Sequence, residues 1–299
     1  MQGSAPIIRG IPSYPTRVDR LAGIRIVTTA LNLPGPVAVQ RLRELGASVV
    51  KVEPPQGDPF EAICRSWYGR LHESTEVLRI DLKTDPGRDE MSRRLETADL
   101  LVTAQRASAL ERMGLGPASL ASRFPRLCHV AIFGHAPPDD GLAGHDLTYL
   151  AALGLVDPPL LPPTLFADMS GAEHAVSMAL SLLLGRERGS ADRVAHVALA
   201  DAAAALAQPL REGLTRPGKM LGGGYAGYNL YAALDGWLAV AVLEPRFADR
   251  LATLFNLEKL DSVMLHERFA KHDIAYWEAW ARENDLPIVA VRDPHKEKR

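Results

Sequence analysis

The sequence predicts an α/β protein: a large Rossmann-like domain built on a parallel sheet, followed by a smaller α+β domain. One observation is that short β-branched runs alternate with helix-like segments over most of the chain, as in successive βαβ units. A second is a glycine-rich stretch at 217–224, beyond which two β-type runs flank Asp235-Gly236, a strong hairpin signal. We therefore place the domains at residues 1–215 and 216–299, and allow the tail at 286–299 to return to the large domain.

The first βαβ unit is the best defined. Residues 24–27 and 49–52 are β-branched runs, and 37–45 between them has helical spacing of apolar residues, with Gly46 as a C-cap. Such a unit implies a parallel sheet with a right-handed crossover. The turn after the first run is not Gly-x-Gly-x-x-Gly, so a dinucleotide site has no support here.

The remaining elements are expected in chain order. In the large domain these are strands at 99–103 and 127–132, helices at 87–98, 117–123 and 146–155, and an apolar run at 194–199 leading into a helix at 202–210. In the small domain they are strands at 228–234 and 237–242, helices at 246–255, 264–271 and 274–284, and a short apolar run at 287–291. Residues 1–20 are expected to form an irregular arm.

Composition excludes several classes of protein. The chain has 299 residues, of which 47% are hydrophobic and 23% are charged, as in a soluble globular protein with ample core. A net charge of -2 gives no general affinity for nucleic acid or for an anionic membrane. The two cysteines, Cys64 and Cys128, make neither a disulfide framework nor a metal-ligand pattern, so we expect a reducing compartment and no metal site. The N-terminus has no secretory pattern and the most apolar window, 175–184, is too short to span a bilayer, which predicts a cytoplasmic protein.

The stretch from Leu165 to Gly185 is where we expect the chemistry. It is apolar on nearly every face, which predicts a buried helix. Ser170 and Glu173 fit a capping box, so the helix is expected to start just after Asp168. A carboxylate at that place lies where unpaired N–H groups and the positive end of the helix dipole converge. Asp168 is therefore either a helix cap or a functional group.

Six ordered stretches of the chain resemble the group formed by family III CoA-transferases and α-methylacyl-CoA racemases. They are Leu-Ala-Gly-Ile-Arg-Ile (21–26), Leu-Gly-Ala-Ser-Val-Val-Lys-Val-Glu-Pro-Pro (45–55), Ile-Asp-Leu-Lys (80–83), Ala-Gly-His-Asp-Leu-Thr-Tyr (143–149), Leu-Phe-Ala-Asp-Met-Ser-Gly (165–171) and Val-Leu-Glu-Pro-Arg-Phe (242–247). The resemblance runs from about 21 to 291, and the Gly-His-Asp stretch resembles the racemase branch more than the transferase branch.

The resemblance implies three catalytic residues. His145 matches the racemase histidine that takes or gives a proton on one face of the substrate α-carbon, Asp168 matches the carboxylate on the other face, and Glu244 matches an acidic residue that supports the histidine. A histidine and a desolvated carboxylate can both have near-neutral pKa values, as the removal and return of an α-proton requires. In the transferase branch the same aspartate attacks the thioester instead. Structural readings stay open, since His145 could simply start a helix and Glu244 could be a helix N-terminal carboxylate.

The resemblance also implies a binding site and an assembly. Asp146, Tyr149 and Tyr228 match positions that line the catalytic site, although each tyrosine could be a packing residue with a polar tip, and Arg106 matches an arginine near the CoA phosphates. Coenzyme A enters as the thioester substrate, and no separate cofactor is expected. An interlocked homodimer is implied, in which Glu244 of one chain meets the site of the other.

Three function hypotheses result. The first is racemisation or epimerisation of a 2-methylacyl-CoA, the second is CoA transfer, and the third is a degenerate, non-catalytic member of the family. The third is suggested by departures from the family pattern: residues 72–78 replace a basic Asn-Arg-Gly-Lys-type turn, Ala107-Ser108 replace Pro-Gly, and 134–142 lacks the usual glycine-rich pattern.

Overall fold

The structure, a computed structural model, describes residues 19–293 and divides the chain into two compact units. The boundary falls between Ala207 and Gln208, a few residues before the expected one. Apart from Asp19 and Arg20, the expected irregular arm lies outside the described residues.

The first unit is built on a sheet of six parallel strands in the order β3-β2-β1-β4-β5-β6. The strands are β1 (Arg25–Thr28), β2 (Ser48–Glu53), β3 (Glu76–Arg79), β4 (Leu100–Thr103), β5 (Cys128–Phe133) and β6 (Val194–Ala198). This is the Rossmann order, so the predicted α/β class with a parallel sheet is confirmed. The chain reverses direction across the sheet between β1 and β4, and in such sheets ligands bind beyond the carboxyl ends of the strands at that point.

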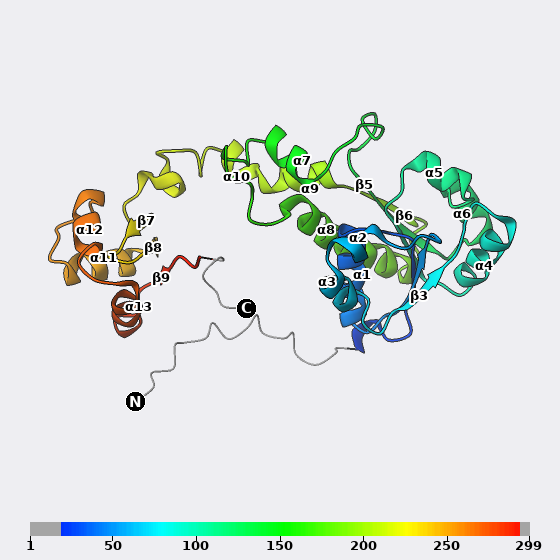
Figure 1. The fold of residues 1–299 in the computed structure, drawn as a ribbon, viewed down its shortest axis with the longest axis horizontal. Coiled ribbons are helices and arrows are strands. Elements are labelled where there is room, and N and C mark those ends of the chain that lie inside the picture. The colour runs from blue at the N-terminus through cyan, green and yellow to red at the C-terminus, as the bar shows by residue number, and fades with distance from the viewer. Residues whose placement is uncertain (1–18, 294–299) are drawn as a thin grey trace. The chain divides into compact units, whose positions relative to one another are not determined.

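Helices cover both faces of this sheet (Figure 1). They are α1 (Pro34–Glu44), α2 (Pro59–Ile63), α3 (Arg65–Leu71), α4 (Asp85–Leu95), α5 (Ala107–Arg112), α6 (Pro117–Arg123), α7 (Asp146–Ala152), α8 (Phe166–Glu187) and α9 (Leu199–Leu206), after the short 3-10 turn η1 (Asp19–Leu21). One core lies between the sheet and α1, α3, α7, α8 and α9, and the other lies between the sheet and α4, α5 and α6. The strands are therefore buried on both faces, which explains their nearly continuous apolar runs.

The helix that carries Asp168 differs from the prediction in two ways. Helix α8 begins at Phe166, so Asp168 lies within its first turn, and the expected capping box is wrong: the Ser170 hydroxyl donates to the Ala202 carbonyl at 3.4 Å, and Glu173 pairs with Arg41 of α1. The helix is also not buried all round. The outer face exposes apolar side chains, among them Leu184 at 52%.

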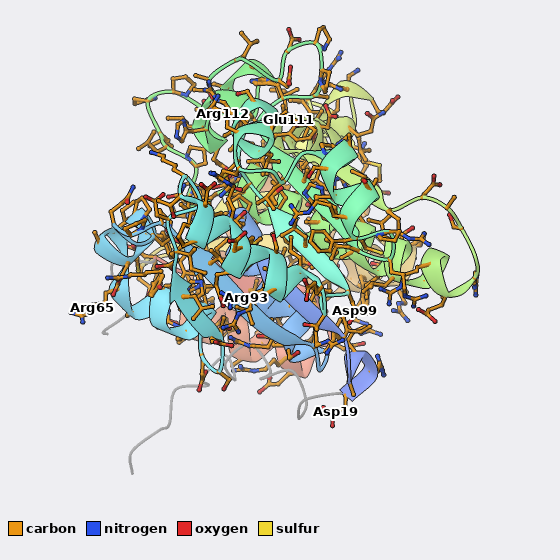
Figure 2. All side chains as sticks on the ribbon, turned by 90° about the vertical axis from the view of Figure 1, so that its right-hand side faces the viewer. Asp19, Arg65, Arg93, Asp99, Glu111 and Arg112 are labelled. Atoms are coloured by element: carbon orange, nitrogen blue, oxygen red, sulfur yellow. The ribbon has the colours of Figure 1, made fainter. Side chains whose placement is uncertain are left out.

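The C-terminal end of α8 is fixed to the amino end of the sheet. Arg186, which is almost completely buried, pairs with Asp99 at 3.1 Å. Asp99, labelled in Figure 2, also accepts a hydrogen bond from the Arg25 N–H at the start of β1. A paired arginine can be buried because its charge is compensated. Helix α8 is thus anchored at the end away from Asp168.

The second unit contains a three-stranded antiparallel sheet and three main helices. It comprises α10 (Gln208–Arg211), the π-helical turn η2 (Met220–Gly224), β7 (Tyr228–Ala232), β8 (Trp237–Ala241), α11 (Pro245–Leu254), α12 (Ser262–Phe269), α13 (Ile274–Glu283) and β9 (Ile288–Ala290). Strands β7 and β8 pair around Asp235-Gly236, so the predicted hairpin is confirmed. Strand β9 pairs with β8, so Ile288–Ala290 is part of the sheet of the small unit.

Candidate active site

The structure brings four of the predicted site residues together beyond the carboxyl end of β5, where α7 begins. His145 is the N-cap of α7 and is exposed, with its backbone N–H donating to the Thr148 hydroxyl at 3.0 Å. Asp146, the first residue of the helix, is buried, with 5% of its surface exposed. One carboxylate oxygen of Asp146 accepts the backbone N–H of Asp168 at 3.0 Å. This bond ties the start of α8 to the start of α7.

Asp168 occupies an unusual electrostatic environment. Its side chain is partly buried and lies close to the Asp146 carboxylate, with no lysine or arginine paired to it in the described range 19–293. Burial, with a smaller contribution from Asp146, raises the pKa of Asp168 to about 6, and His145 opposes this rise. Both effects follow from the cost of holding negative charge away from water and near another negative charge. Asp168 can therefore take up or release a proton close to neutral pH.

Tyr149 lies on the inner face of α7 and is 3% exposed. The ring of His135, in the loop after β5, packs edge-on against it with the centroids 5.1 Å apart. Burial and the charges of Asp168 and Asp146 raise the pKa of Tyr149. His135 was not singled out from the sequence, since no motif or spacing connects it to the site.

Arg106 lies at the same edge of the sheet, beyond β4. Its side chain is exposed and its carbonyl oxygen accepts the N–H groups of Ala109 and Leu110, so it opens helix α5. The neighbouring Gln105 bridges to the loop after β1 by accepting the Thr29 hydroxyl at 2.8 Å. The structure shows no bond between Arg106 and the Asp168 group, and a role at the CoA phosphates stays a prediction.

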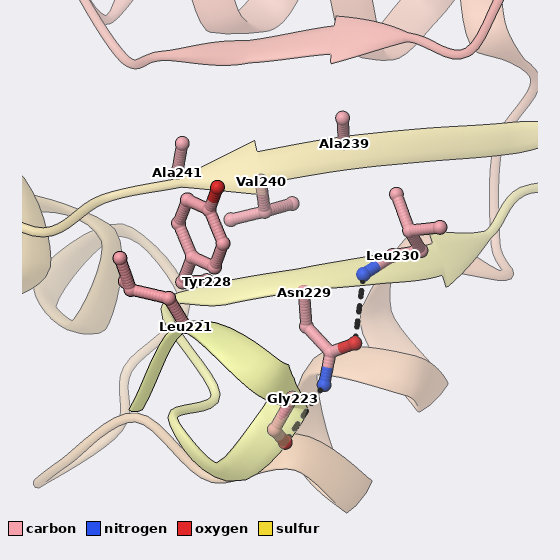
Figure 3. A pocket seen from close by; sticks show the side chains of 8 residues that line it. All are labelled: Leu221, Gly223, Tyr228, Asn229, Leu230, Ala239, Val240 and Ala241. Atoms are coloured by element: carbon pink, nitrogen blue, oxygen red, sulfur yellow. Dashed lines mark hydrogen bonds between the residues drawn. The ribbon is translucent and has the colours of Figure 1, made fainter. Parts of the chain in front are cut away.

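Glu244 and Tyr228 belong to the second unit. Glu244 is exposed and is the N-cap of α11, although its side chain makes no capping hydrogen bond. Tyr228 starts β7 and lines a pocket of about 290 Å³. Figure 3 shows the other lining residues, which are Leu221, Gly223, Asn229, Leu230, Ala239, Val240 and Ala241. That Glu244 and Tyr228 join the Asp168 group stays a prediction.

A second group of charged side chains lies at the carboxyl end of β2, and sequence reasoning missed it. We call it the Lys51 cluster; it comprises Lys51, Glu53, Asp58, Tyr68 and His72. The Lys51 ammonium is completely buried and lies 2.6 Å from Asp58, 3.0 Å from Glu53 and 2.9 Å from the His72 ring. Tyr68 donates to Glu53 at 2.8 Å. The sequence feature that could have revealed this cluster is the lysine inside the otherwise apolar run 49–52.

Residues 19–293 contain neither a membrane-spanning helix nor a metal-binding cluster. No helix there is long and apolar enough to cross a membrane. Within the same range, no group of three or more histidine, cysteine, aspartate or glutamate side chains has an arrangement that could hold a metal ion.

The arrangement of His145 and Asp168 is suited to proton transfer. The carboxylate has a near-neutral pKa and is not neutralised by a cation, and the exposed imidazole lies near enough to influence it. General acid–base catalysis works best with groups of this kind. A carboxylate of this exposure can also act as a nucleophile toward a thioester.

Comparison with known proteins identifies the family. The chain is 30% identical over 287 residues to the probable fatty acyl-CoA transferase Rv3272 of Mycobacterium tuberculosis, covering 84% of this chain and 72% of that protein. It is 29% identical to the α-methylacyl-CoA racemase of Homo sapiens, covering 77% of this chain and 63% of that protein. It is 28% identical to the succinate–glutarate CoA-transferase of Agrobacterium fabrum, covering 86% of this chain and 70% of that protein.

Solved structures agree with this fold. A crystal structure of Rv3272 superposes with a TM-score of 0.81 at 25% identity, covering 93% of this chain and 87% of that one. A CAIB/BAIF family protein from Brucella suis shares the fold with a TM-score of 0.75. The profile of CoA-transferase family III matches residues 21–297. The chain therefore belongs to CoA-transferase family III.

Proposed function

We propose that the protein is a racemase or epimerase that inverts the α-carbon of a 2-methylacyl-CoA thioester by 1,1-proton transfer. The observation that carries the proposal is Asp168, whose pKa lies near 6 beside the His145 imidazole. One of these two groups removes the α-proton, the electron pair moves onto the thioester oxygen to give an enolate, and the other group returns a proton to the opposite face. The racemases among the relatives support this reaction.

The other predicted residues take supporting roles in this proposal. Glu244 supports the His145 imidazole, Asp146 and Tyr228 line the site, and Arg106 binds CoA phosphate. Asp146 also positions Asp168, because its carboxylate accepts the Asp168 N–H. The CoA thioester is the substrate, and the reaction needs no other cofactor.

Proton NMR of a 2-methylacyl-CoA in deuterated buffer tests this function. Wild type should replace the α-proton with deuterium, and His145→Ala and Asp168→Asn should each lower racemisation by a factor of about 10² to 10⁴, the usual contribution of a positioned acid or base. Asp89→Asn, at an exposed site on α4, is a matched control that should behave as wild type. A pure, folded wild type that exchanges no α-proton with several 2-methylacyl-CoAs would rule out the proposal.

CoA transfer is the second candidate, because relatives at similar identity are CoA-transferases. In this reaction Asp168 attacks the thioester carbonyl and CoA leaves as a thiolate, giving an enzyme-bound acyl anhydride. CoA then attacks the aspartyl carbonyl, which forms an aspartyl-CoA thioester and releases the acid. Hydroxylamine should then trap Asp168 only after acyl-CoA is added.

The third candidate is a non-catalytic member of the family. In that case calorimetry would detect no CoA binding to the folded protein.

We also propose a homodimer. The support within the first unit is the outer face of α8, where Met178 and Leu184 are 40% and 52% exposed in the single chain. A second copy would remove this apolar surface from water. Light scattering should give twice the chain mass, and Leu184→Glu should shift the protein toward the monomer.

A further inference from the structure

The phenol ring of Tyr149 occupies a slot between two glycines. A Cβ atom at Gly134, in the loop after β5, would lie 2.5 Å from the Tyr149 hydroxyl oxygen, and a Cβ atom at Gly144 would overlap the ring itself. The His135 ring packs against the phenol edge-on. Any larger residue at the two glycine positions would displace the phenol. The surrounding loops therefore hold the Tyr149 ring in one place.

The hydroxyl at the end of this ring has no hydrogen-bond partner among residues 19–293. Buried tyrosine hydroxyls usually have one. The Tyr149 oxygen is not among the described side-chain atoms that are shut off from water without a partner, so it keeps contact with solvent, where a ligand can reach it. The nearby charges are the carboxylates of Asp168 and Asp146, which raise the pKa of Tyr149 together with burial. The phenol is thus protonated at neutral pH, and it can donate a hydrogen bond.

We propose that the Tyr149 hydroxyl donates a hydrogen bond to the thioester carbonyl oxygen of the substrate and stabilises the enolate oxygen that forms there. This inference rests on the proposed function. An enolate needs donors placed in advance where its negative charge develops. The backbone N–H of Asp168 is not available for this task, because it is already bonded to Asp146.

The phenolic proton stays on Tyr149 throughout the reaction. The α-proton moves to His145 or Asp168, and the hydrogen bond from Tyr149 shortens as charge builds on the oxygen. Because the oxygen is common to both enantiomers, the bond assists the reaction equally in the two directions. This distinguishes Tyr149 from the two bases, each of which serves one face of the α-carbon.

Tyr149→Phe tests the inference, since it removes only the hydroxyl. We expect kcat to fall about 10- to 10³-fold with little change in KM, and to fall equally for the two enantiomers of a 2-methylacyl-CoA. His145→Ala and Asp168→Asn should instead change α-proton exchange unequally for the two enantiomers. Tyr276→Phe, which removes an exposed hydroxyl, is the control. If wild type is active and Tyr149→Phe is within twofold of it, the inference is wrong and the proposed function stands.

A second measurement reports on the hydrogen bond without turnover. In a 2-methylacyl-CoA labelled with carbon-13 at the thioester carbonyl, binding to wild type should move the carbonyl resonance downfield, and Tyr149→Phe should remove most of that shift. If wild type binds the thioester without exchanging its α-proton, the proposed function fails and this shift still decides the role of Tyr149. An equal shift in both proteins, or no binding of acyl-CoA by wild type, overturns the inference.

Discussion

Two groups of ionisable side chains lie at the carboxyl edge of one sheet, and they differ in how their charges are compensated. In the Lys51 cluster two carboxylates share one buried ammonium, at 2.6 and 3.0 Å. Around Asp168 two carboxylates lie near each other without a paired cation among residues 19–293, and the pKa of Asp168 rises to about 6. The first arrangement holds the loops together, whereas the second keeps a proton exchangeable.

The Lys51 cluster also contains a neutral histidine. In the Lys51 cluster, burial and the Lys51 charge lower the pKa of His72, which therefore stays uncharged beside the ammonium. Asp58 in the same cluster accepts the N–H of Asn32, in the loop after β1. Charge compensation, and not the mere presence of acid and base side chains, separates the structural cluster from the candidate active site.

Lys51→Met should have the largest effect on stability. It removes the ammonium that pairs with the two buried carboxylates Glu53 and Asp58, and breaking a buried ion pair in this way costs about 3–5 kcal/mol of unfolding free energy. Urea unfolding followed by circular dichroism measures this, with Lys83→Met at an exposed position as the control. A loss below about 1 kcal/mol would mean that the cluster does not depend on its cation.

Asp168→Asn should act in the opposite direction. The folded-state pKa of about 6 lies above the ordinary value of 3.8, so ionised Asp168 destabilises the fold. The cost is absent below about pH 4, grows as the pH rises toward 6 and is complete above it. After allowance for partial exposure, Asp168→Asn should stabilise the protein by about 1–2 kcal/mol at pH 8 and by nearly nothing at pH 4. Thermal unfolding at the two pH values tests this, and a destabilised variant at pH 8 would contradict it.

Glu173→Gln should have the smallest effect. Glu173 lies 3.2 Å from Arg41, but the two side chains are 56% and 36% exposed. Exposed ion pairs contribute little, so the expected loss is under about 0.5 kcal/mol and should vanish in 1 M salt. Chemical unfolding at low and high salt measures it. A loss comparable to that of Lys51→Met would show that burial does not decide how much an ion pair of this protein contributes to stability.

Local pattern was enough to predict much of the fold. Helix α6 has the predicted bounds, and β7 and β8 flank the predicted turn at Asp235-Gly236. Strand β3 was not predicted, since Glu76–Arg79 is mostly exposed and has no apolar run, and its place depends on pairing with β2. The start of α8 was misplaced because the Asp146 carboxylate, distant in sequence, accepts the Asp168 N–H in the first helical turn, ahead of the local Ser170–Glu173 pattern on which the prediction rested.

The site was predictable only in part, for a related reason. His145, Asp146 and Asp168 could be named because their residue types and order resemble a family pattern. His135 and the Lys51 cluster could not, since their significance comes from contacts such as the 5.1 Å ring packing on Tyr149 and from complete burial of Lys51. The spacing of residues along the chain predicts neither the ring packing nor the burial.

The packing of α1 against α8 has a consequence during translation. The Arg41–Glu173 pair joins residues separated by 132 positions, and the apolar side of α1, with Val37 and Leu42, shares a core with α8. A ribosome that has released α1 must therefore still synthesise more than half of the first unit before the partner of that helix emerges. Until then the nascent chain presents an uncovered apolar surface, which makes this stage of its synthesis prone to aggregation.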